Sequence, residues 1–233
     1  MLYPVRCPVC GDIVIPRGSK ICCPCEKKLQ LIAEPRCKKC SKPIENDQNE
    51  YCSDCERKDY HFDHGYSLWV YDSIMKKSIS DFKYRYKKEY ARYYIEKIVE
   101  GYGDTLNRLA PDVLVPVPIH KSKYRERGYN QAEILAYGIA KELNLPVIPD
   151  LLIRNKKTLP QKQLSDKERL KNLQEAFILN DKALSDYPKK LKRVLLVDDI
   201  YTTGSTIEAC ANALIKNGIK EIYFITLCIG KGF

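Results

Sequence analysis

The sequence predicts an α/β fold with a mainly parallel sheet, preceded by a small cysteine-rich domain. Near the carboxyl terminus, apolar runs at 194–197 and 222–229 flank an amphipathic helix, which makes a strand–helix–strand unit. At the amino terminus, eight cysteines occur as four C-x-x-C pairs within residues 1–60. We therefore expect two domains, one spanning residues 1–60 and the other residues 61–233.

The composition is that of a folded, basic protein. Its 233 residues are 44% hydrophobic, which is enough for at least one core, and the formal net charge is +10. No apolar run approaches the roughly 18 residues needed to cross a bilayer, and the amino terminus does not read as a signal peptide. We therefore expect a cytoplasmic protein. Because thiols stay reduced in that compartment, the eleven cysteines indicate metal ligands rather than disulfides.

The cysteine pairs form an internal repeat with an offset of thirty residues. Each C-x-x-C pair supplies two thiolates at tetrahedral geometry, so the four pairs predict two Cys₄ zinc sites. The spacing leaves open whether the sites are sequential or interleaved, although the short intervals favour sequential sites. It also leaves open whether Cys23 replaces Cys22. The expected ligands are Cys7, Cys10, Cys22, Cys25, Cys37, Cys40, Cys52 and Cys55.

Both zinc sites are expected to be structural rather than catalytic. Four thiolates leave no open coordination position, and a segment with so few large apolar side chains needs metal to fold. With eight thiolates and two Zn²⁺ ions the net charge of residues 1–60 is about −2, which argues against a basic nucleic-acid surface there. Cys210 and Cys228 fall in the predicted helix and the last strand, where a buried and inert thiol is expected.

A phosphate-binding loop is predicted where the strand 194–197 ends. Asp198 and Asp199 follow this strand, and the chain then turns through T-T-G-S-T into the helix. Hydroxyl groups and the free N–H groups at the start of a helix bind an anion. Two carboxylates would repel a bare phosphate, but they suit a ligand that also presents sugar hydroxyls or Mg²⁺. We therefore expect a ribose 5-phosphate rather than a Walker-type nucleotide, since no G-x-x-x-x-G-K-[ST] motif occurs.

The stretch R-V-L-L-V-D-D-I-Y-T-T-G-S-T resembles the signature of type I phosphoribosyltransferases. The resemblance implies a Rossmann-like domain that binds phosphoribosyl pyrophosphate (PRPP) together with Mg²⁺. It places the ribose on Asp198 and Asp199, and the 5-phosphate on Thr202, Thr203, Gly204, Ser205 and Thr206. The family holds pyrophosphate on a loop after an earlier strand, here the strand 113–117 and the basic loop 121–127. The candidates there are His120, Lys121, Arg125 and Arg127.

The segment between the cysteines and these motifs predicts a strand at 66–71 and one long helix from about 73 to 101. Eight Lys or Arg residues against three acidic residues lie between positions 76 and 97, interleaved with tyrosines. Cations and rings in alternation suit single-stranded nucleic acid, although a charge run on a helix is often only a solvated face. The nucleic-acid candidates are Lys83, Arg85, Lys87 and Lys88. A further helix, capped by Asn130 and Glu133, should run to about 143.

Several further motifs narrow the resemblance to the ComF family of competence-associated, phosphoribosyltransferase-like proteins. They include V-P-V-P, R-G-Y-N-Q-A-E at 127–133, and an exposed arm at 154–177. Within and beside this arm the family positions are Arg154, Thr158, Gln161, Arg169 and Asn172. The resemblance implies a role in natural transformation, with single-stranded DNA handled beside an inner-membrane channel and a DNA translocase. It therefore also implies a peripheral place at the inner face of the membrane.

Two functions remain open at this point. In the first, the chain is a PRPP- or ribose 5-phosphate-binding module in DNA uptake. In the second, it is a PRPP-dependent transferase, similar to an amidophosphoribosyltransferase, that acts on an unknown acceptor in nucleotide metabolism. The sequence shows neither an acceptor-binding hood nor a glutaminase domain, so enzymatic activity is left undecided.

Overall fold

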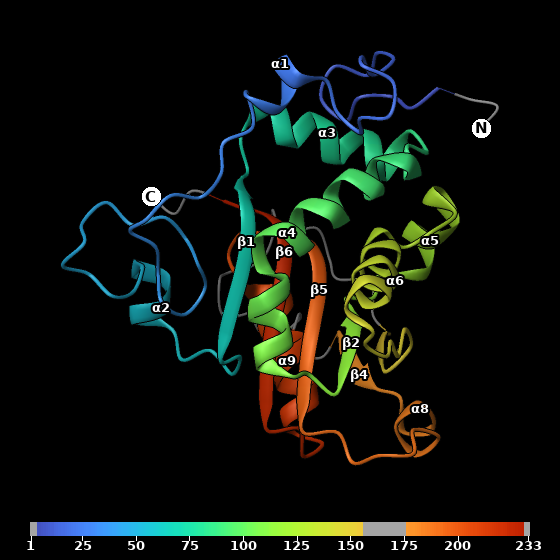
Figure 1. Ribbon diagram of the computed structural model, residues 1–233. Coiled ribbons are helices and arrows are strands. Elements are labelled where there is room, and N and C mark those ends of the chain that lie inside the picture. Colours follow the sequence, from blue (N-terminus) through green and yellow to red (C-terminus); the bar gives the residue numbers. More distant parts are fainter. Residues whose placement is uncertain (1–3, 156–175, 231–233) are drawn as a thin grey trace.

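A four-stranded parallel sheet forms the centre of the computed structural model, which describes residues 4–155 and 176–230 (Figure 1). The strand order is β1-β6-β5-β2, and all three pairings are parallel. Such sheets are buried on both faces, and the apolar run from Val194 to Val197 of central strand β5 is fully buried. The predicted mainly parallel sheet is confirmed. The strands are β1 (His64–Val70), β2 (Val113–Pro116), β5 (Arg193–Tyr201) and β6 (Glu221–Ile229).

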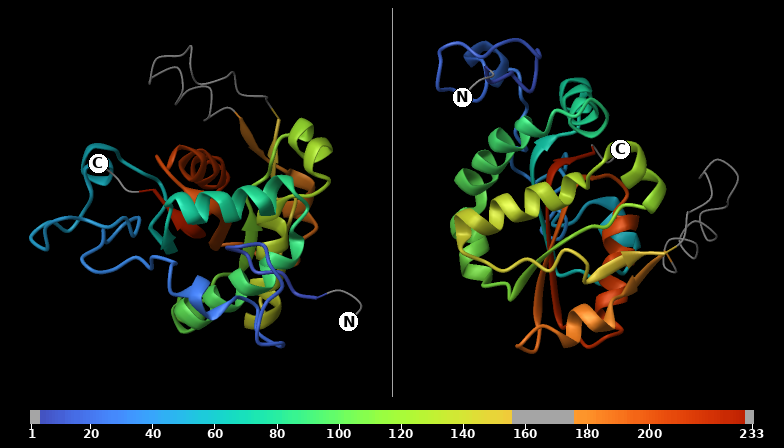
Figure 2. Two further views of the ribbon diagram at one scale, coloured as in Figure 1. Left: turned by 90° about the horizontal axis from the view of Figure 1, so that it is seen from above. Right: turned by 90° about the vertical axis from the view of Figure 1, so that its right-hand side faces the viewer.

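Helices cover both faces of this sheet, as the right-hand view of Figure 2 shows. Alternate residues of β5 point to opposite sides, so Leu195 and Val197 join one core, whereas Val194 and Leu196 join the other. The first core contains residues of α3, α4 and α6, and the second contains residues of α9 and the β3–β4 hairpin. The bounds are α3 (Ser73–Tyr84), α4 (Ala91–Leu109), α6 (Gln131–Leu143), α9 (Ser205–Ile215), β3 (Leu152–Arg154) and β4 (Phe177–Leu179).

Two predicted elements differ from the structure. The helix expected at 73–101 is divided into α3 and α4, with a 3-10 turn η1 (Lys88–Tyr90) between them. The division follows from a left-handed backbone at Tyr86, with φ of 55°, which no helix can accommodate. The basic loop expected at 121–127 is the helix α5 (Lys121–Arg127). His120 caps its start by accepting a hydrogen bond from the Ser122 N–H, and Gly128 ends it with a φ of 73°.

The two cysteine-rich segments lie in different places on this core (Figure 1). The first, with α1 (Cys23–Glu26), packs on α3 and α4, where the Ser78 hydroxyl donates to the Pro8 carbonyl. The second, with α2 (Ser53–Arg57), lies beside β1, where the Gly65 N–H donates to the Lys39 carbonyl at 2.8 Å.

The segment that joins the two cysteine-rich regions runs along the outer edge of β1. The Ile32 N–H donates to the Leu68 carbonyl at 3.2 Å, and the Val70 N–H donates to the Gln30 carbonyl at 2.9 Å. Between these two bonds, Leu31 and Trp69 form an antiparallel bridge. Strand β1 is therefore hydrogen-bonded on both sides, although it is an edge strand of the four-stranded sheet.

The remaining described elements are short. Strands β3 and β4 form an antiparallel pair, and α8 (Asp181–Ser185) follows β4. At the end of β3 the Arg154 guanidinium lies 5.3 Å from the centre of the Phe177 ring. The rest of the predicted arm, with Thr158, Gln161, Arg169 and Asn172, lies outside the described residues. Within the described ranges, no helix combines the length and the apolar character needed to cross a membrane.

Candidate functional site

The predicted phosphate loop lies at the carboxyl end of the central strand. Strand β5 ends at Tyr201, and α9 begins at Ser205 after a turn of three residues. Gly204 has a φ of 77°, which favours glycine, and it caps the helix. The Glu208 N–H bonds the Gly204 carbonyl, so the N–H groups before Glu208 belong to the free first turn of the helix. Beside this turn, the hydroxyl groups of Thr203 and Ser205 are hydrogen-bonded to each other at 2.9 Å.

The two carboxylates of the motif have different surroundings. Asp198 is partly buried, and its Oδ1 accepts a hydrogen bond from the Asp199 N–H at 2.8 Å. Asp199 is buried, and its carboxylate forms an ion pair with Lys83 and accepts a hydrogen bond of 3.4 Å from the Gln131 amide. The side chains of Lys83 and Asp199 are only 17% and 5% exposed, so their charges are largely removed from solvent.

These surroundings move the two carboxyl pKa values apart. Burial, with the Asp199 charge beside it, raises the pKa of Asp198 well above its ordinary range. Burial also acts on Asp199, but the neighbouring Lys83 ammonium outweighs it and lowers the pKa of that group. Asp198 therefore binds a proton more readily than Asp199, whose negative charge is paired with the Lys83 ammonium.

Lys83 is the residue for which the structure differs most from the sequence interpretation. We interpreted it as a nucleic-acid candidate together with Arg85, Lys87 and Lys88, but its ammonium faces the Asp199 carboxylate. Arg85 is largely exposed and pairs with Asp81, and Lys88 lies over the Tyr129 ring at 4.5 Å. The sequence held a signal for this, because Lys83 lies four residues after the buried Ile79 and so shares its helix face.

The residues predicted to bind pyrophosphate lie in different surroundings, some buried and some exposed. Arg127 is buried, and its guanidinium donates to the Gln131 amide oxygen and to the Tyr84 hydroxyl, both at 2.8 Å. Since Gln131 in turn donates to Asp199, Arg127 belongs to the network of the carboxylate pair. Lys121 and Arg125 lie on the exposed side of α5, and His120 serves as its cap. Sequence reasoning did not identify Tyr84 or Gln131 as members of the site.

The cysteines form two groups that each suit one metal ion. In each group the four sulfur atoms lie within 4.8 Å of one another, and Cys40 Sγ is 3.6 Å from Cys52 Sγ. A tetrahedral zinc with Zn–S bonds of about 2.3 Å requires sulfurs about 3.8 Å apart, which fits this geometry. The groups are sequential, and Cys22 rather than the exposed Cys23 is a member. They are Cys7, Cys10, Cys22 and Cys25, and then Cys37, Cys40, Cys52 and Cys55.

We predict that the purified protein holds two zinc ions per chain. Cys22→Ser should reduce this to about one, because three thiolates hold zinc less well than four. Cys23→Ser changes a neighbouring thiol that lies outside the group, so it should leave two. Metal analysis of the folded variants measures both values. Loss of zinc from Cys23→Ser with retention by Cys22→Ser would reverse the ligand assignment.

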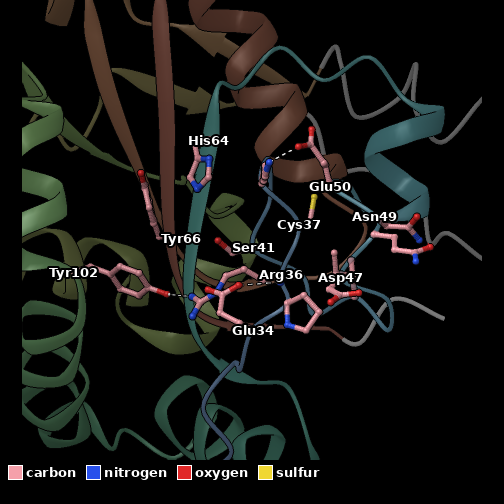
Figure 3. A pocket seen from close by; sticks show the side chains of 14 residues that line it. Glu34, Arg36, Cys37, Ser41, Asp47, Asn49, Glu50, His64, Tyr66 and Tyr102 are labelled. Carbon is pink, nitrogen blue, oxygen red and sulfur yellow. Dashed lines mark hydrogen bonds and ion pairs between the residues drawn. The ribbon is translucent and has the colours of Figure 1, made fainter.

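A hollow also lies between the second cysteine-rich segment and β1 (Figure 3). It has a volume of about 610 Å³, and Arg36, Tyr66 and Tyr102 line it. Its charged groups include internal pairs, such as Arg36 with Glu34 and Lys38 with Glu50. None of the phosphate-loop residues lines it. We therefore place the candidate site at the end of β5.

The fold and the site define a phosphoribosyltransferase-type domain preceded by a zinc-binding region. Comparison with protein families agrees, because residues 1–56 match the double zinc ribbon domain and residues 129–232 match the phosphoribosyl transferase domain. The two cysteine groups are accordingly called the first and the second zinc ribbon below.

The particular relatives are competence proteins. The chain is 29% identical over 221 residues to competence protein F of Haemophilus influenzae, covering 93% of each chain. It is 29% identical over 209 residues to competence protein ComFC of Bacillus subtilis, covering 86% of this chain and 80% of that one. The DNA utilization protein YhgH of Escherichia coli is 31% identical over 118 residues, 51% of this chain and 49% of that one. The chain is a homologue of the ComF and ComFC competence proteins, which confirms the resemblance.

Proposed function

We propose that the chain binds PRPP, or a ribose 5-phosphate, at the end of β5 and acts in DNA uptake. The observation that carries the proposal is the pair Asp198 and Asp199 at the end of the central strand, followed at once by a glycine-capped loop and a free helix start. The first turn of α9 and the hydroxyls of 202–206 would hold the 5-phosphate. The carboxylates would accept hydrogen bonds from the ribose hydroxyls. Mg²⁺ would accompany PRPP.

The cationic side chains near the two carboxylates are suited to bind the pyrophosphate group of PRPP. The Arg127 guanidinium donates hydrogen bonds to the neutral groups of Gln131 and Tyr84, so its charge is available to an anion. Lys121, Arg125 and His120 lie on α5 or at its start. We propose these groups as the pyrophosphate contacts, because charge-assisted bonds from guanidinium and ammonium are the strong ones for phosphate. Asp199 can keep Lys83 on one oxygen while the other accepts a ribose hydroxyl.

A second surface beside this site fits single-stranded DNA. Tyr84, Tyr86 and Tyr124, which lie at the end of α3, in the turn after it and on α5, are exposed by 48%, 66% and 50%. The Lys123 ammonium lies over the Tyr84 ring at 5.9 Å. Two further cations, Arg85 and Lys88, lie in the same turn between α3 and α4 as Tyr86. Bases stack on such rings while phosphates meet the cations. This surface supports the uptake role, and a DNA translocase and an inner-membrane channel are the partners proposed from the family resemblance.

Transfer chemistry is the second candidate function, and the complete set of carboxylates and cations favours it. A PRPP-dependent transferase needs pyrophosphate to leave the ribose carbon while positive charge develops on the sugar. Here Asp199, and Asp198 when ionised, could stabilise that charge, and Arg127 could stabilise the leaving group. The acceptor is unidentified. We propose residues 1–60 as the zinc-binding domain and residues 61–233 as the domain that binds the ligand.

Calorimetric titration of PRPP with Mg²⁺ into the zinc-loaded protein tests the proposal. We expect micromolar binding by the wild type and its loss in Thr203→Ala and Asp199→Ala, because each change removes one half of the site. Thr105→Ala, on α4, is the matched control and should bind normally. Absence of binding by the folded wild type would contradict the proposal. If binding occurs, release of pyrophosphate with candidate acceptors separates the transferase from the binding module.

A further inference from the structure

We infer that the second zinc ribbon positions the phosphate loop through Tyr60 and His61, so that ribose-phosphate affinity depends on the metal held by Cys37, Cys40, Cys52 and Cys55. The inference rests on the proposed function of that loop. It makes the ribbon a supporting part of the ligand site, in addition to its role as a folding unit.

The first contact reaches the loop itself. Tyr60 follows the last ribbon cysteine by five residues, and its hydroxyl donates to the Thr203 carbonyl at 2.9 Å. The ring is buried and stacks on Phe62 with centroids 5.0 Å apart. The Lys39 ammonium, from between two cysteines of the ribbon, donates to the Tyr60 carbonyl at 2.8 Å. The second ribbon therefore fixes the position of Tyr60, and Tyr60 in turn hydrogen-bonds the phosphate loop.

The second contact reaches the helix that follows the loop. The His61 N–H donates to the Glu208 carboxylate at 2.8 Å, and the His61 ring contacts the other oxygen of that carboxylate. Glu208 is buried in the first turn of α9. Because the free N–H groups of this turn are the proposed phosphate ligands, a fixed Glu208 also fixes their direction.

An aromatic layer joins the ribbon to the underside of the loop. Phe62 packs edge-on against Phe224 with centroids 5.0 Å apart, and Phe224 stacks on Tyr201 at 4.8 Å. These rings share one core with Cys37, Cys40 and Cys52. A side chain at Gly204 would overlap the Tyr201 hydroxyl, so the loop rests directly on this layer. Packed layers of this kind transmit displacement because they contain little free volume.

The first ribbon provides an internal comparison. Its contacts are with α3 and α4, for example the Ser78 hydroxyl to the Pro8 carbonyl and Lys97 to Glu26 at 3.0 Å. Within the part of the chain that the structure describes, no hydrogen bond or ion pair is seen between residues 4–29 and residues 202–208. A metal-dependent effect on the loop should therefore come from the second ribbon alone.

Loss of the second metal should act through these anchors. A Cys₄ site rarely keeps its shape without metal, so residues 37–55 would become less ordered. Tyr60 and His61 would then lose their support from the ribbon, and the loop and first turn of α9 would sample more conformations. The ligand would have to order them on binding, which weakens its affinity.

The test compares Tyr60→Phe with Tyr187→Phe. Both remove one hydroxyl that donates to a backbone carbonyl, since Tyr187 donates to the Asp112 carbonyl at 3.2 Å, away from the loop. We expect Tyr60→Phe to weaken ribose 5-phosphate binding about three- to tenfold, from the loss of one buried hydrogen bond. It should also speed amide hydrogen exchange at 203–208. Tyr187→Phe should change neither quantity.

The metal is tested separately with one ligand variant from each ribbon. Cys52→Ser and Cys22→Ser should each cost about one zinc, but only Cys52→Ser should speed exchange at 203–208. If Cys52→Ser does not fold, Tyr60→Phe still tests whether the ribbon positions the phosphate loop. Unchanged exchange and affinity in Tyr60→Phe would overturn the inference. If the wild type binds no ribose 5-phosphate, the proposed function fails, whereas the exchange measurement still tests the coupling.

Discussion

Replacing Asp199 by asparagine should lower the free energy of unfolding by about 3–5 kcal/mol at neutral pH, the range found when one partner of a buried ion pair is removed. The reason is Lys83, whose side chain is only 17% exposed and would keep its charge without a counter-ion. Asparagine preserves the shape of the side chain, so the packing around it changes little. Urea denaturation followed by circular dichroism measures the change.

Two controls make this result specific to the ion pair. Glu50→Gln breaks the exposed pair with Lys38, whose side chains are 59% and 63% exposed, and should cost less than about 1 kcal/mol. Lys83→Met combined with Asp199→Asn should be less destabilising than the sum of the single changes, because no charge is then left unpaired. Additive costs would show that Lys83 and Asp199 do not interact in solution.

Ribose 5-phosphate should bind about tenfold more tightly per unit rise in pH, over the range in which Asp198 is protonated in the free protein. Burial and the Asp199 charge raise the pKa of Asp198, so the free protein keeps this proton to a higher pH than an ordinary carboxyl group does. A carboxylate that accepts hydrogen bonds from ribose must be ionised. Binding then releases one proton, and it is favoured as the proton concentration falls.

Calorimetry from the ordinary carboxyl range upward in pH measures this slope, as the difference between the wild type and Asp198→Asn, in which only the ligand phosphate titrates. Buffers with different ionisation enthalpies count the released proton directly. Asp198→Asn should bind more weakly and with no such slope. A wild-type affinity independent of pH would contradict the protonated state of Asp198.

The Asp198 carboxyl group gives folding stability a pH dependence opposite to that of ligand affinity: stability falls as pH rises. Because the pKa of Asp198 is higher in the folded than in the unfolded chain, its contribution to stability is complete below the ordinary carboxyl range. This contribution is lost as pH rises through the folded-state pKa. Asp198→Asn should therefore stabilise the free protein at neutral and higher pH. A site that binds ribose through this residue thus keeps a group that is unfavourable for folding.

The sequence predicted the parts of the molecule that short-range patterns define. Four offsets of thirty residues marked the cysteine groups, and the apolar runs on either side of Ile207 to Ile215 marked β5, α9 and β6. The loop that we propose for phosphate could be predicted because strand, acid pair, glycine and hydroxyls follow one another along the chain.

The contacts between distant segments could not be predicted in this way. Lys83 and Asp199 are 116 residues apart, and the charge run around Lys83 concealed which lysine faces inward. The division between α3 and α4 depends on a left-handed Tyr86, with neither Gly nor Pro in the turn to mark it. For α5 the marker was present, since Gly128 follows its last residue as a C-terminal cap, but the basic composition was interpreted as a loop.

The segment along the outside of β1 has a consequence for how the chain can be divided. Gln30 to Ile32 and Lys39 occupy backbone groups that the last strand of a sheet would otherwise expose. Exposed strand edges recruit further strands from other molecules, which leads to association and fibre formation. A fragment that begins at the predicted boundary near His61 would retain the ligand loop but uncover this edge. The segment 30–39 thus covers the edge of the sheet, and it should be retained whenever the ligand-binding part of the chain is prepared.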